Sequence, residues 1–329
     1  MHQRLVGVWL LVAALLGVAA WPGGAAAARR VELAIRGRYT NVGVSPNLLA
    51  PGPWAGTFVL GDLNYGWVSV RRSADAGVLR SIYVGRSTLG IASVPATQEL
   101  FAANVRGSSV MMLNLRTDGA LVDSVLVGQT ANLVAASTDG RFVLATAYEP
   151  ALISIFDRDF DFSRRTLVLD DRPAGLVVTR RRFPTRAYVV GHDRGKLFAF
   201  DFNPSSFTIV DSLITRPGAS FIRLSPDEST AYVSADNRVL VVGLDSGLVE
   251  REIPVGSEPL GLDVSPDGRY VLVANSGSSS ISLIDTERLI VVDEITAGLG
   301  PTDVLFVSGS RAYVTLQGEN ALAVIQLDR

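Results

Sequence analysis

Short stretches of alternating hydrophobic and polar residues recur along the chain, and turns rich in Gly, Pro, Asp and Ser separate them. The segment 260–295 shows the pattern clearly: an apolar run, a Ser-Pro-Asp-Gly turn at 265–268, and three further apolar or alternating runs. Period-two alternation over roughly four to eight residues is typical of β-strands that bury one face. No segment keeps the 3.6-residue period of an amphipathic helix. The pattern therefore predicts an all-β protein built from units of four short antiparallel strands.

This four-stranded unit is repeated seven times. Equivalent positions in the second strand of each unit follow one another at intervals of 40 to 44 residues, and they are Phe58, Phe101, Leu144, Tyr188, Tyr232, Leu272 and Tyr313. A fixed period of this length indicates a repeat array, and β units of this size are propeller blades, because solenoids of similar period are mostly helical. We therefore predict an all-β, seven-bladed β-propeller of four-stranded antiparallel blades.

The two ends of the repeat array predict how the ring closes. The last unit stops after three strands, and an alternating segment, Val31–Ile35, precedes the first unit. A strand supplied by the N-terminus would complete the last blade and cover an edge that would otherwise aggregate. We expect Val31–Ile35 to be that closing strand. Tyr39–Val44 is then expected to be the inner strand of the first blade, ahead of a Ser-Pro-Asn turn at 45–47.

The first 28 residues have the features of a secretory signal peptide. A short basic start, Met1–Arg4, is followed by the apolar run Leu5–Trp21 and by four alanines, Ala25–Ala28, that suit cleavage by signal peptidase. The alternative is an uncleaved membrane anchor, since about 17 apolar residues is the lower limit for spanning a bilayer. We interpret residues 1–28 as the signal and 29–329 as one propeller domain. The mature protein is expected in the periplasm or outside the cell, with no membrane span.

Composition narrows the range of functions. The 30 Lys and Arg residues are balanced by 32 Asp and Glu, so a nucleic-acid partner is not expected. The chain has no Cys, which excludes thiolate metal sites, Cys nucleophiles and c-type haem attachment. His192 is the only histidine left after signal cleavage. A three-His metal centre is therefore excluded, and a Ser-His-Asp triad would have to use His192. We expect no catalytic residue, no metal and no cofactor.

Several repeat motifs resemble the YVTN family of β-propeller repeats. The residues that carry the resemblance are Tyr232-Val233-Ser234-Ala235, Leu272-Val273-Ala274-Asn275 and Tyr313-Val314-Thr315-Leu316, with Ser-Pro-Asp-Gly before the second motif and Ile284-Asp285-Thr286 after it. The resemblance is strong from Ser225 onward and fades toward the N-terminus. It implies a seven-bladed, exported, bacterial or archaeal protein. The family motif is structural and assigns no catalytic residue, and relatives range from surface-layer proteins to accessories of quinone-linked dehydrogenases.

Strand alternation also predicts which side chains line the central channel. In most of the predicted inner strands one set of alternate positions is apolar and should face the neighbouring blades, so the intervening positions should face the channel. Most of these are small or apolar, and the polar exceptions are Asn41, Arg223, Asp263 and Asp303. They make up the candidate channel site. The alternative interpretation is an Arg–Asp pair that only fills and satisfies the channel, because polar groups in a confined space need partners with or without a ligand.

A second candidate site is the rim that carries the loops entering each inner strand and those between second and third strands. Aromatic residues and Arg are enriched at binding hot spots. The rim candidates are Tyr65, Trp67, Arg86, Arg106, Tyr148, Arg172, His192, Arg194 and Arg216. Acidic residues share these loops and largely cancel the charge, so an ordinary solvated surface is the alternative.

These observations favour an exported, non-catalytic, monomeric propeller that binds or scaffolds a protein or a cell-surface polymer. The alternative is an enzyme or enzyme subunit, either a lactonase-like hydrolase or an accessory of a quinone-linked dehydrogenase, with a small ligand in the central channel. Fold alone does not decide between them.

Overall fold

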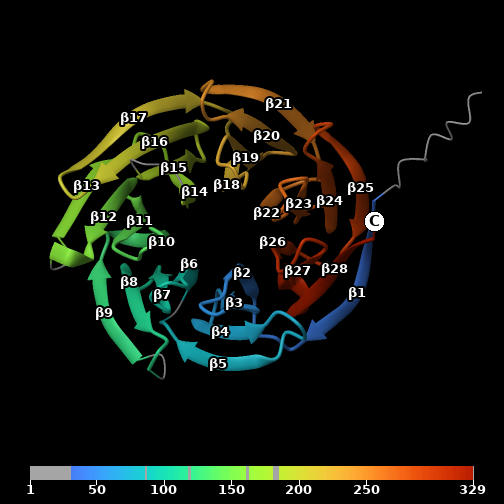
Figure 1. Ribbon diagram of the computed structural model, residues 1–329, viewed down its shortest axis with the longest axis horizontal. Coiled ribbons are helices and arrows are strands. Elements are labelled where there is room, and N and C mark those ends of the chain that lie inside the picture. The colour runs from blue at the N-terminus through green and yellow to red at the C-terminus, as the bar shows by residue number, and fades with distance from the viewer. Residues whose placement is uncertain (1–30, 86, 118–119, 161–162, 181–184, 329) are drawn as a thin grey trace, which may run out of the picture. The chain divides into compact units, whose positions relative to one another are not determined.

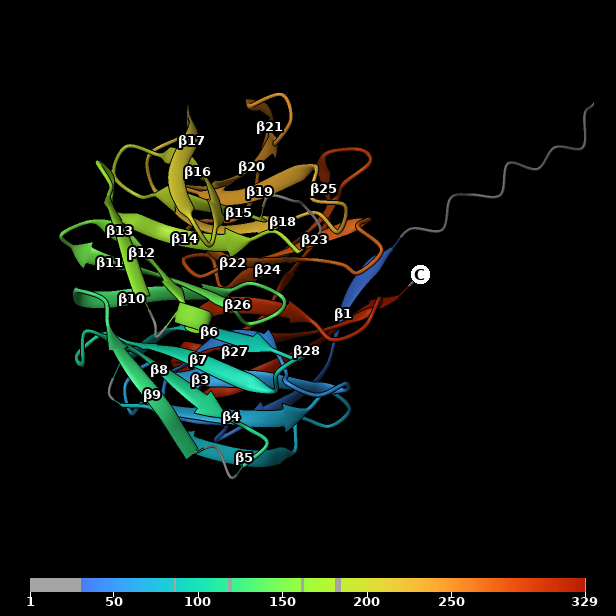
Figure 2. The same cartoon turned by 60° about the vertical axis from the view of Figure 1, so that its left-hand side comes forward.

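The computed structural model describes residues 31–85, 87–117, 120–160, 163–180 and 185–328. In these residues, twenty-eight strands form seven four-stranded antiparallel sheets that follow one another around a ring (Figure 1; Figure 2 shows the ring turned by 60°). The prediction of a seven-bladed β-propeller is therefore confirmed. Among the described residues, no helical segment has the length and hydrophobicity needed to cross a bilayer.

We number the blades in chain order and give each from its inner to its outer strand. Blades 1 to 3 are β2 (Pro46–Pro51), β3 (Thr57–Asp62), β4 (Trp67–Arg72) and β5 (Val78–Tyr83); β6 (Thr88–Val94), β7 (Glu99–Asn104), β8 (Ser109–Asn114) and β9 (Ala120–Leu126); and β10 (Gln129–Ala136), β11 (Phe142–Glu149), β12 (Leu152–Asp157) and β13 (Ser163–Val168).

Blades 4 to 7 continue the ring in the same way. They are β14 (Pro173–Val178), β15 (Thr185–Gly191), β16 (Lys196–Asn203) and β17 (Ser206–Ile214); β18 (Ala219–Leu224), β19 (Thr230–Ala235), β20 (Arg238–Gly243) and β21 (Leu248–Pro254); β22 (Pro259–Val264), β23 (Tyr270–Asn275), β24 (Ser280–Asp285) and β25 (Ile290–Thr296); and β26 (Pro301–Phe306), β27 (Arg311–Leu316), β28 (Ala321–Asp328) and β1 (Glu32–Thr40). Two short 3-10 turns, Arg158–Phe160 and Gln317–Glu319, follow strands β12 and β27.

The N-terminal strand closes the ring as predicted. Strand β1 is the outer strand of blade 7 and pairs antiparallel with β28, with Leu33 opposite Leu327 and Ile35 opposite Ile325. Leu33 and its partner are buried in the apolar cluster between blades 6 and 7. The first and last segments of the propeller are therefore held together by an antiparallel ladder that is interrupted by one bulge, between Ile35 and Gly37.

One strand prediction in blade 1 is wrong. The inner strand is β2 (Pro46–Pro51), whereas the sequence pattern had suggested Tyr39–Val44. Strand β1 passes a bulge between Ile35 and Gly37 and continues to Thr40, so residues 41–45 become the loop that leads into blade 1. Pro46 opens the inner strand, where a missing N–H group is tolerated.

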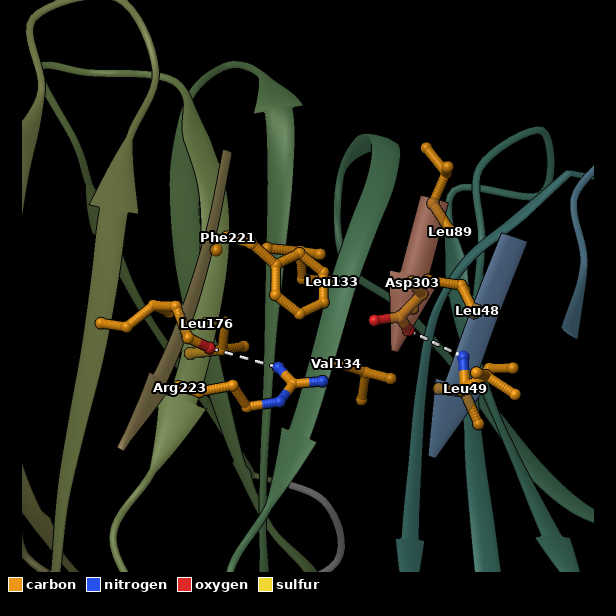
Figure 3. A pocket seen from close by; sticks show the side chains of 13 residues that line it. Leu48, Leu49, Leu89, Leu133, Val134, Leu176, Phe221, Arg223 and Asp303 are labelled. Carbon is orange, nitrogen blue, oxygen red and sulfur yellow. Dashed lines mark hydrogen bonds between the residues drawn. The ribbon is translucent and has the colours of Figure 1, made fainter. Parts of the chain in front are cut away.

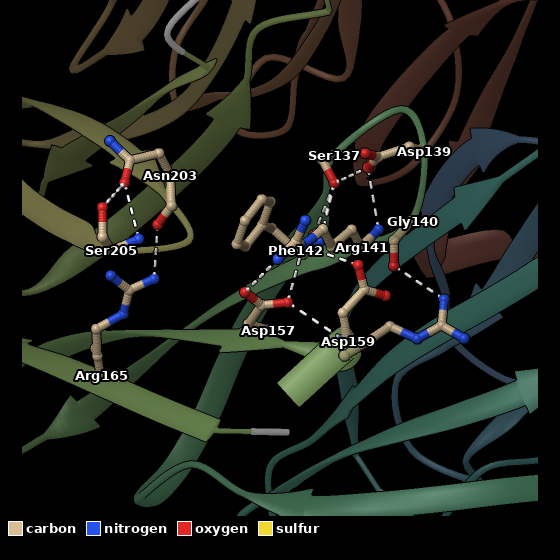
Figure 4. Close-up of polar contacts among 11 residues, drawn as sticks. Ser137, Asp139, Gly140, Arg141, Phe142, Asp157, Asp159, Arg165, Asn203 and Ser205 are labelled. Carbon is tan, nitrogen blue, oxygen red and sulfur yellow. Dashed lines mark hydrogen bonds and ion pairs between the residues drawn. The ribbon is translucent and has the colours of Figure 1, made fainter. Parts of the chain in front are cut away.

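The recurring Ser-x-Asp turn links the inner strand of a blade to its second strand. In blade 3, the hydroxyl of Ser137 donates to Asp139 at 2.5 Å and accepts the N–H of Phe142 at 2.9 Å (Figure 4). In blade 6, Ser265 makes the same contacts with Asp267 and Tyr270. The side chains thus satisfy backbone groups in a tight connection, which explains why this motif marks the repeat.

Candidate functional site

The channel at the centre of the ring is narrow because large apolar side chains fill much of it. The seven inner strands surround it (Figure 1), and Figure 3 shows Leu133, Phe221 and Asp303 projecting into the space between them. The remaining cavity, of about 60 Å³, is also lined by Leu48, Leu89 and Leu176, among others.

Of the channel candidates, Arg223 and Asp303 line this cavity, and Asp263 lies beside Arg223 without lining it. The Nε atom of Arg223 lies 3.7 Å from Oδ1 of Asp263, and its guanidinium stacks over the ring of Phe221 at 4.4 Å from the centroid. Its Nη1 atom also donates to the carbonyl of Ile222 at 3.2 Å. Arg223 is therefore held on its own strand and toward the acidic pair.

The two carboxylates connect neighbouring inner strands. Oδ2 of Asp263, on β22, accepts the N–H of Phe306 on β26 at 2.8 Å. Oδ2 of Asp303, on β26, accepts the N–H of Leu49 on β2 at 2.8 Å, and this bond joins blade 7 to blade 1 (Figure 3). These bonds tie the inner strands of blades 6, 7 and 1 together across the closure of the ring.

Burial changes the acidity of both groups. It raises the pKa of Asp263, while the positive charge of Arg223 opposes that rise. Asp303 is only 1% exposed, and burial raises its pKa to about 7, again against the influence of Arg223 and its backbone hydrogen bonds. A carboxyl group that titrates near neutral pH is suited to general acid–base chemistry. The adjoining cavity is small, however, at about 60 Å³.

The fourth channel candidate, Asn41, does not lie in the channel. It is exposed in the loop between β1 and β2 and has a left-handed backbone conformation with φ of 57°. The assignment of Asn41 to the channel was wrong because it took Tyr39–Val44, instead of β2, as the inner strand of blade 1. Leu48 and Leu49 of β2 supply the blade 1 side of the cavity instead. No motif marked them, since a leucine on an inner strand is an ordinary core residue.

The loops predicted to form a rim do share one face of the ring, which we call the upper rim. Backbone hydrogen bonds link each entry loop to a loop between second and third strands, for example from Val84 N–H to the Gly66 carbonyl at 2.8 Å. At blade 1 this rim is aromatic: Tyr65 is 58% exposed and Trp67 49%. Tyr83, at the end of β5, meets Trp67 edge-on with ring centroids 5.6 Å apart. Tyr83 had not been singled out from the sequence, because its strand pairing with Trp67 is visible only in the structure.

The rim arginines differ in their partners. Arg172 pairs with Asp193 at 2.5 Å, Arg194 with Asp170 at 3.3 Å, and Arg216 with Glu252 at 3.1 Å. Exposed pairs of this kind contribute little to stability, but they reduce the charge offered to a partner. Arg106 is exposed in the loop after β7, and its guanidinium has no ion-pair partner within the described part of the chain. Among the rim arginines that the structure describes, Arg106 is the one most available for binding.

The other rim candidates are placed as follows. Tyr148 lies partly buried at the end of β11, and its burial raises the pKa of its hydroxyl. His192 is exposed, with Nδ1 at 3.0 Å from the carbonyl of Ala219, so the imidazole is part of the loop's own hydrogen bonding. Arg86 lies outside the described residues.

Comparisons with known proteins support the fold and leave the activity open. No family model matches the chain. The chain is 27% identical over 205 residues to 6-phosphogluconolactonase of Bacillus subtilis (strain 168), a match that covers 53% of this chain and 59% of the relative's length. Two solved structures are similar in fold. The first is hydrazine synthase of Kuenenia stuttgartiensis (TM-score 0.74, 16% identity, 86% of this chain and 95% of that chain). The second is the β-propeller domain of Cps50 (Swd1) from Myceliophteria thermophila (TM-score 0.75, 13% identity, 90% and 100%).

Proposed function

We propose that this protein is an exported, non-catalytic propeller of the YVTN type that captures a protein or cell-surface polymer on its upper rim. The observation that carries the proposal is an upper rim that bears the exposed aromatic group Tyr65, Trp67 and Tyr83 on blade 1 and, on the loop after β7 of blade 2, the exposed Arg106, which has no ion-pair partner among the described residues. Aromatic and Arg side chains dominate binding energy at protein interfaces. The signal-like sequence of residues 1–28 supports a periplasmic or secreted location. In this proposal the protein is a monomer, and one ring provides the whole binding face.

A photo-crosslinking amino acid at Tyr65 or at Arg106 is expected to capture the same partner from the envelope fraction or culture fluid. The matched control is the same amino acid at Glu287, which is exposed in the loop between β24 and β25 on the opposite face. Trp67→Ala should weaken partner binding, and with it capture from position 65, about thirtyfold, because losing an aromatic anchor costs about 2 kcal/mol or more. Equal capture from position 287, or capture unchanged by Trp67→Ala, would count against this face.

The second candidate function is lactone hydrolysis, which the partial match to 6-phosphogluconolactonase favours. Such a reaction would use Arg223, Asp263 and Asp303 as the polar groups of the channel. The cavity of about 60 Å³ would have to widen to admit a sugar lactone. A direct assay with 6-phosphogluconolactone decides the matter. We expect hydrolysis no faster than in buffer, and a rate that falls in the Arg223→Gln variant would instead support the enzyme.

A further inference from the structure

The seam between blades 7 and 1 contains a buried arginine with no acidic partner. Arg71, on β4, is the only Lys or Arg among the buried residues of the described chain, at 7% exposure. Its Nε donates to Ser69 Oγ at 2.9 Å, Nη1 to the carbonyl of Ala76 at 3.0 Å, and Nη2 to that of Val42 at 2.7 Å. These bonds use three of the five N–H groups of the guanidinium.

Other, more exposed arginines in this protein have carboxylate partners. Arg158 donates to Glu99 at 2.6 Å, and Arg186 pairs with Asp201 at 2.5 Å. A buried charge without an opposite charge is costly, and burial accordingly lowers the pKa of Arg71. Within the described residues, only neutral hydrogen-bond acceptors offset the cost of burying the charge of Arg71.

The repeat itself does not require a charge at this position. Arg71 is the fifth residue of the third strand of its blade. The fifth residues of the other six third strands are all apolar and buried, and they are Leu113, Phe156, Phe200, Val242, Ile284 and Ile325. A position that breaks the local rule of its own repeat is where function is expected.

Arg71 lines a cavity of about 110 Å³, which we call the Arg71 cavity. Ser69, Ser81, Trp67 and Asp62 line it as well, and the cavity reaches the surface because Trp67 and Ser81 are exposed. Its volume is enough for a carboxylate group with one or two attached carbons.

The carboxylate of Asp62 does not bind the guanidinium of Arg71. Its negative charge limits how much negative charge a ligand in the cavity can carry. The same carboxylate accepts backbone N–H groups of Val44 at 2.7 Å, Asn64 at 3.0 Å and Tyr65 at 2.9 Å, and it makes no ion pair with Arg71. A ligand with a single negative charge gains the attraction of Arg71. A dianion such as phosphate would bring a second charge close to Asp62, so a monoanion is favoured.

The mouth of the cavity is aromatic. Trp67 lines it, and Tyr83 packs edge-on against Trp67 at 5.6 Å between centroids. Both side chains are about half exposed, and together they offer an apolar surface to whatever carries the charged group. A guanidinium at the base with aromatic rings at the entrance suits a carboxylate attached to a ring or short carbon chain.

We propose that the Arg71 cavity binds an organic monocarboxylate, with its carboxylate on the guanidinium and its carbon body against Trp67 and Tyr83. The inference rests on the proposed function, since it names the chemical group that the upper rim of blade 1 recognises. The carboxylate can belong to a free small acid or to an acidic sugar of a polymer, and the probes below separate these two sources.

The test is calorimetric titration of the propeller at neutral pH and low salt with acetate, D-glucuronate and D-glucose. We expect acetate and glucuronate to bind and glucose not to bind. Glucuronate binding tighter than acetate indicates an acidic sugar, and the reverse order indicates a small acid. Equal binding of chloride or inorganic phosphate would overturn the carboxylate assignment, and so would no binding of either acid.

Variants assign the binding to Arg71. Arg71→Met should weaken glucuronate about tenfold or more, since a charge-assisted hydrogen bond is worth about 1.5–3 kcal/mol. Arg116→Met, an exposed arginine in the turn after β8, is the matched control and should bind as the parent does. Should Arg71→Met fail to fold, Arg71→Lys keeps the charge without the planar fork and should still bind more weakly than the parent. Unchanged binding in the folded variant would sink the proposal.

The two proposals can fail separately. If crosslinking from Tyr65 captures a partner while glucuronate and acetate do not bind, only the carboxylate site is wrong. If crosslinking also shows no preference for the upper rim, the proposed function itself falls.

Discussion

Replacement of Arg223 by glutamine is expected to lower the free energy of unfolding by about 3–5 kcal/mol at pH 8 and by less at pH 5. At pH 8, Asp263 and Asp303 would be left buried without the cation that opposes the rise of their pKa values. At pH 5, Asp303 is protonated, because its pKa is about 7, so removing the arginine no longer leaves a charge on this carboxyl group. Urea unfolding at the two pH values measures the difference.

The sign of the pH effect follows from the proton balance. The unfolded chain releases the Asp303 proton near its ordinary pKa of 3.8, whereas the native protein retains it up to about pH 7. Between these values the native state binds more protons, so the free energy of unfolding of the parent protein should fall as pH rises. A shift from 3.8 to about 7 corresponds to roughly 4 kcal/mol for this single group.

An exposed ion pair supplies the control. Arg172 lowers the pKa of Asp193, so that carboxylate stays ionised throughout pH 5 to 8. Arg172→Gln should therefore change stability little, and by the same amount at both pH values. If Arg223→Gln behaves in the same way, the channel pair is not electrostatically coupled as described here.

The parts of the fold that could be predicted from sequence are those encoded locally. The seven units, the Ser-x-Asp turns and the closing strand all follow from alternation and turn residues within about 40 positions. The inner strand of blade 1 could not be placed, because Ser45-Pro46-Asn47 looks like the turns of other blades, and its preceding strand continues past a bulge. That single shift also misplaced Asn41.

The candidate sites were predictable to a similar degree. Alternation singled out Arg223, Asp263 and Asp303, of which Arg223 and Asp303 line the cavity. It could not show that Asp303 accepts the N–H of Leu49, because that bond depends on the register between two blades 254 residues apart in sequence. Nor could it separate Arg106 from the ion-paired arginines of the rim. The cavity at Arg71 could not be predicted, because a single arginine in a strand is typical of a solvent-exposed position.

The second large effect concerns ring closure. A chain that begins at Asn41 lacks β1, and we expect it to melt roughly 10 °C or more below a chain that begins at Arg29. The loss includes the β1–β28 ladder and the buried side chain of Leu33. It also exposes the edge of β28, whose hydrogen-bonding groups then favour association. Scanning calorimetry and size-exclusion chromatography measure the two consequences.

Rescue by the missing strand separates closure from a general loss of stability. A synthetic peptide of residues 31–40 should bind the shortened chain and restore most of the melting temperature, because it can add to the free edge as an extra strand. A peptide with Leu33→Asp should not, since it would place a charge in the apolar cluster between blades 6 and 7. The Glu32→Gln peptide changes an exposed side chain at the same end of the strand and should rescue like the parent. If the shortened chain remains monomeric and melts like the longer one, β1 covers the ring without closing it.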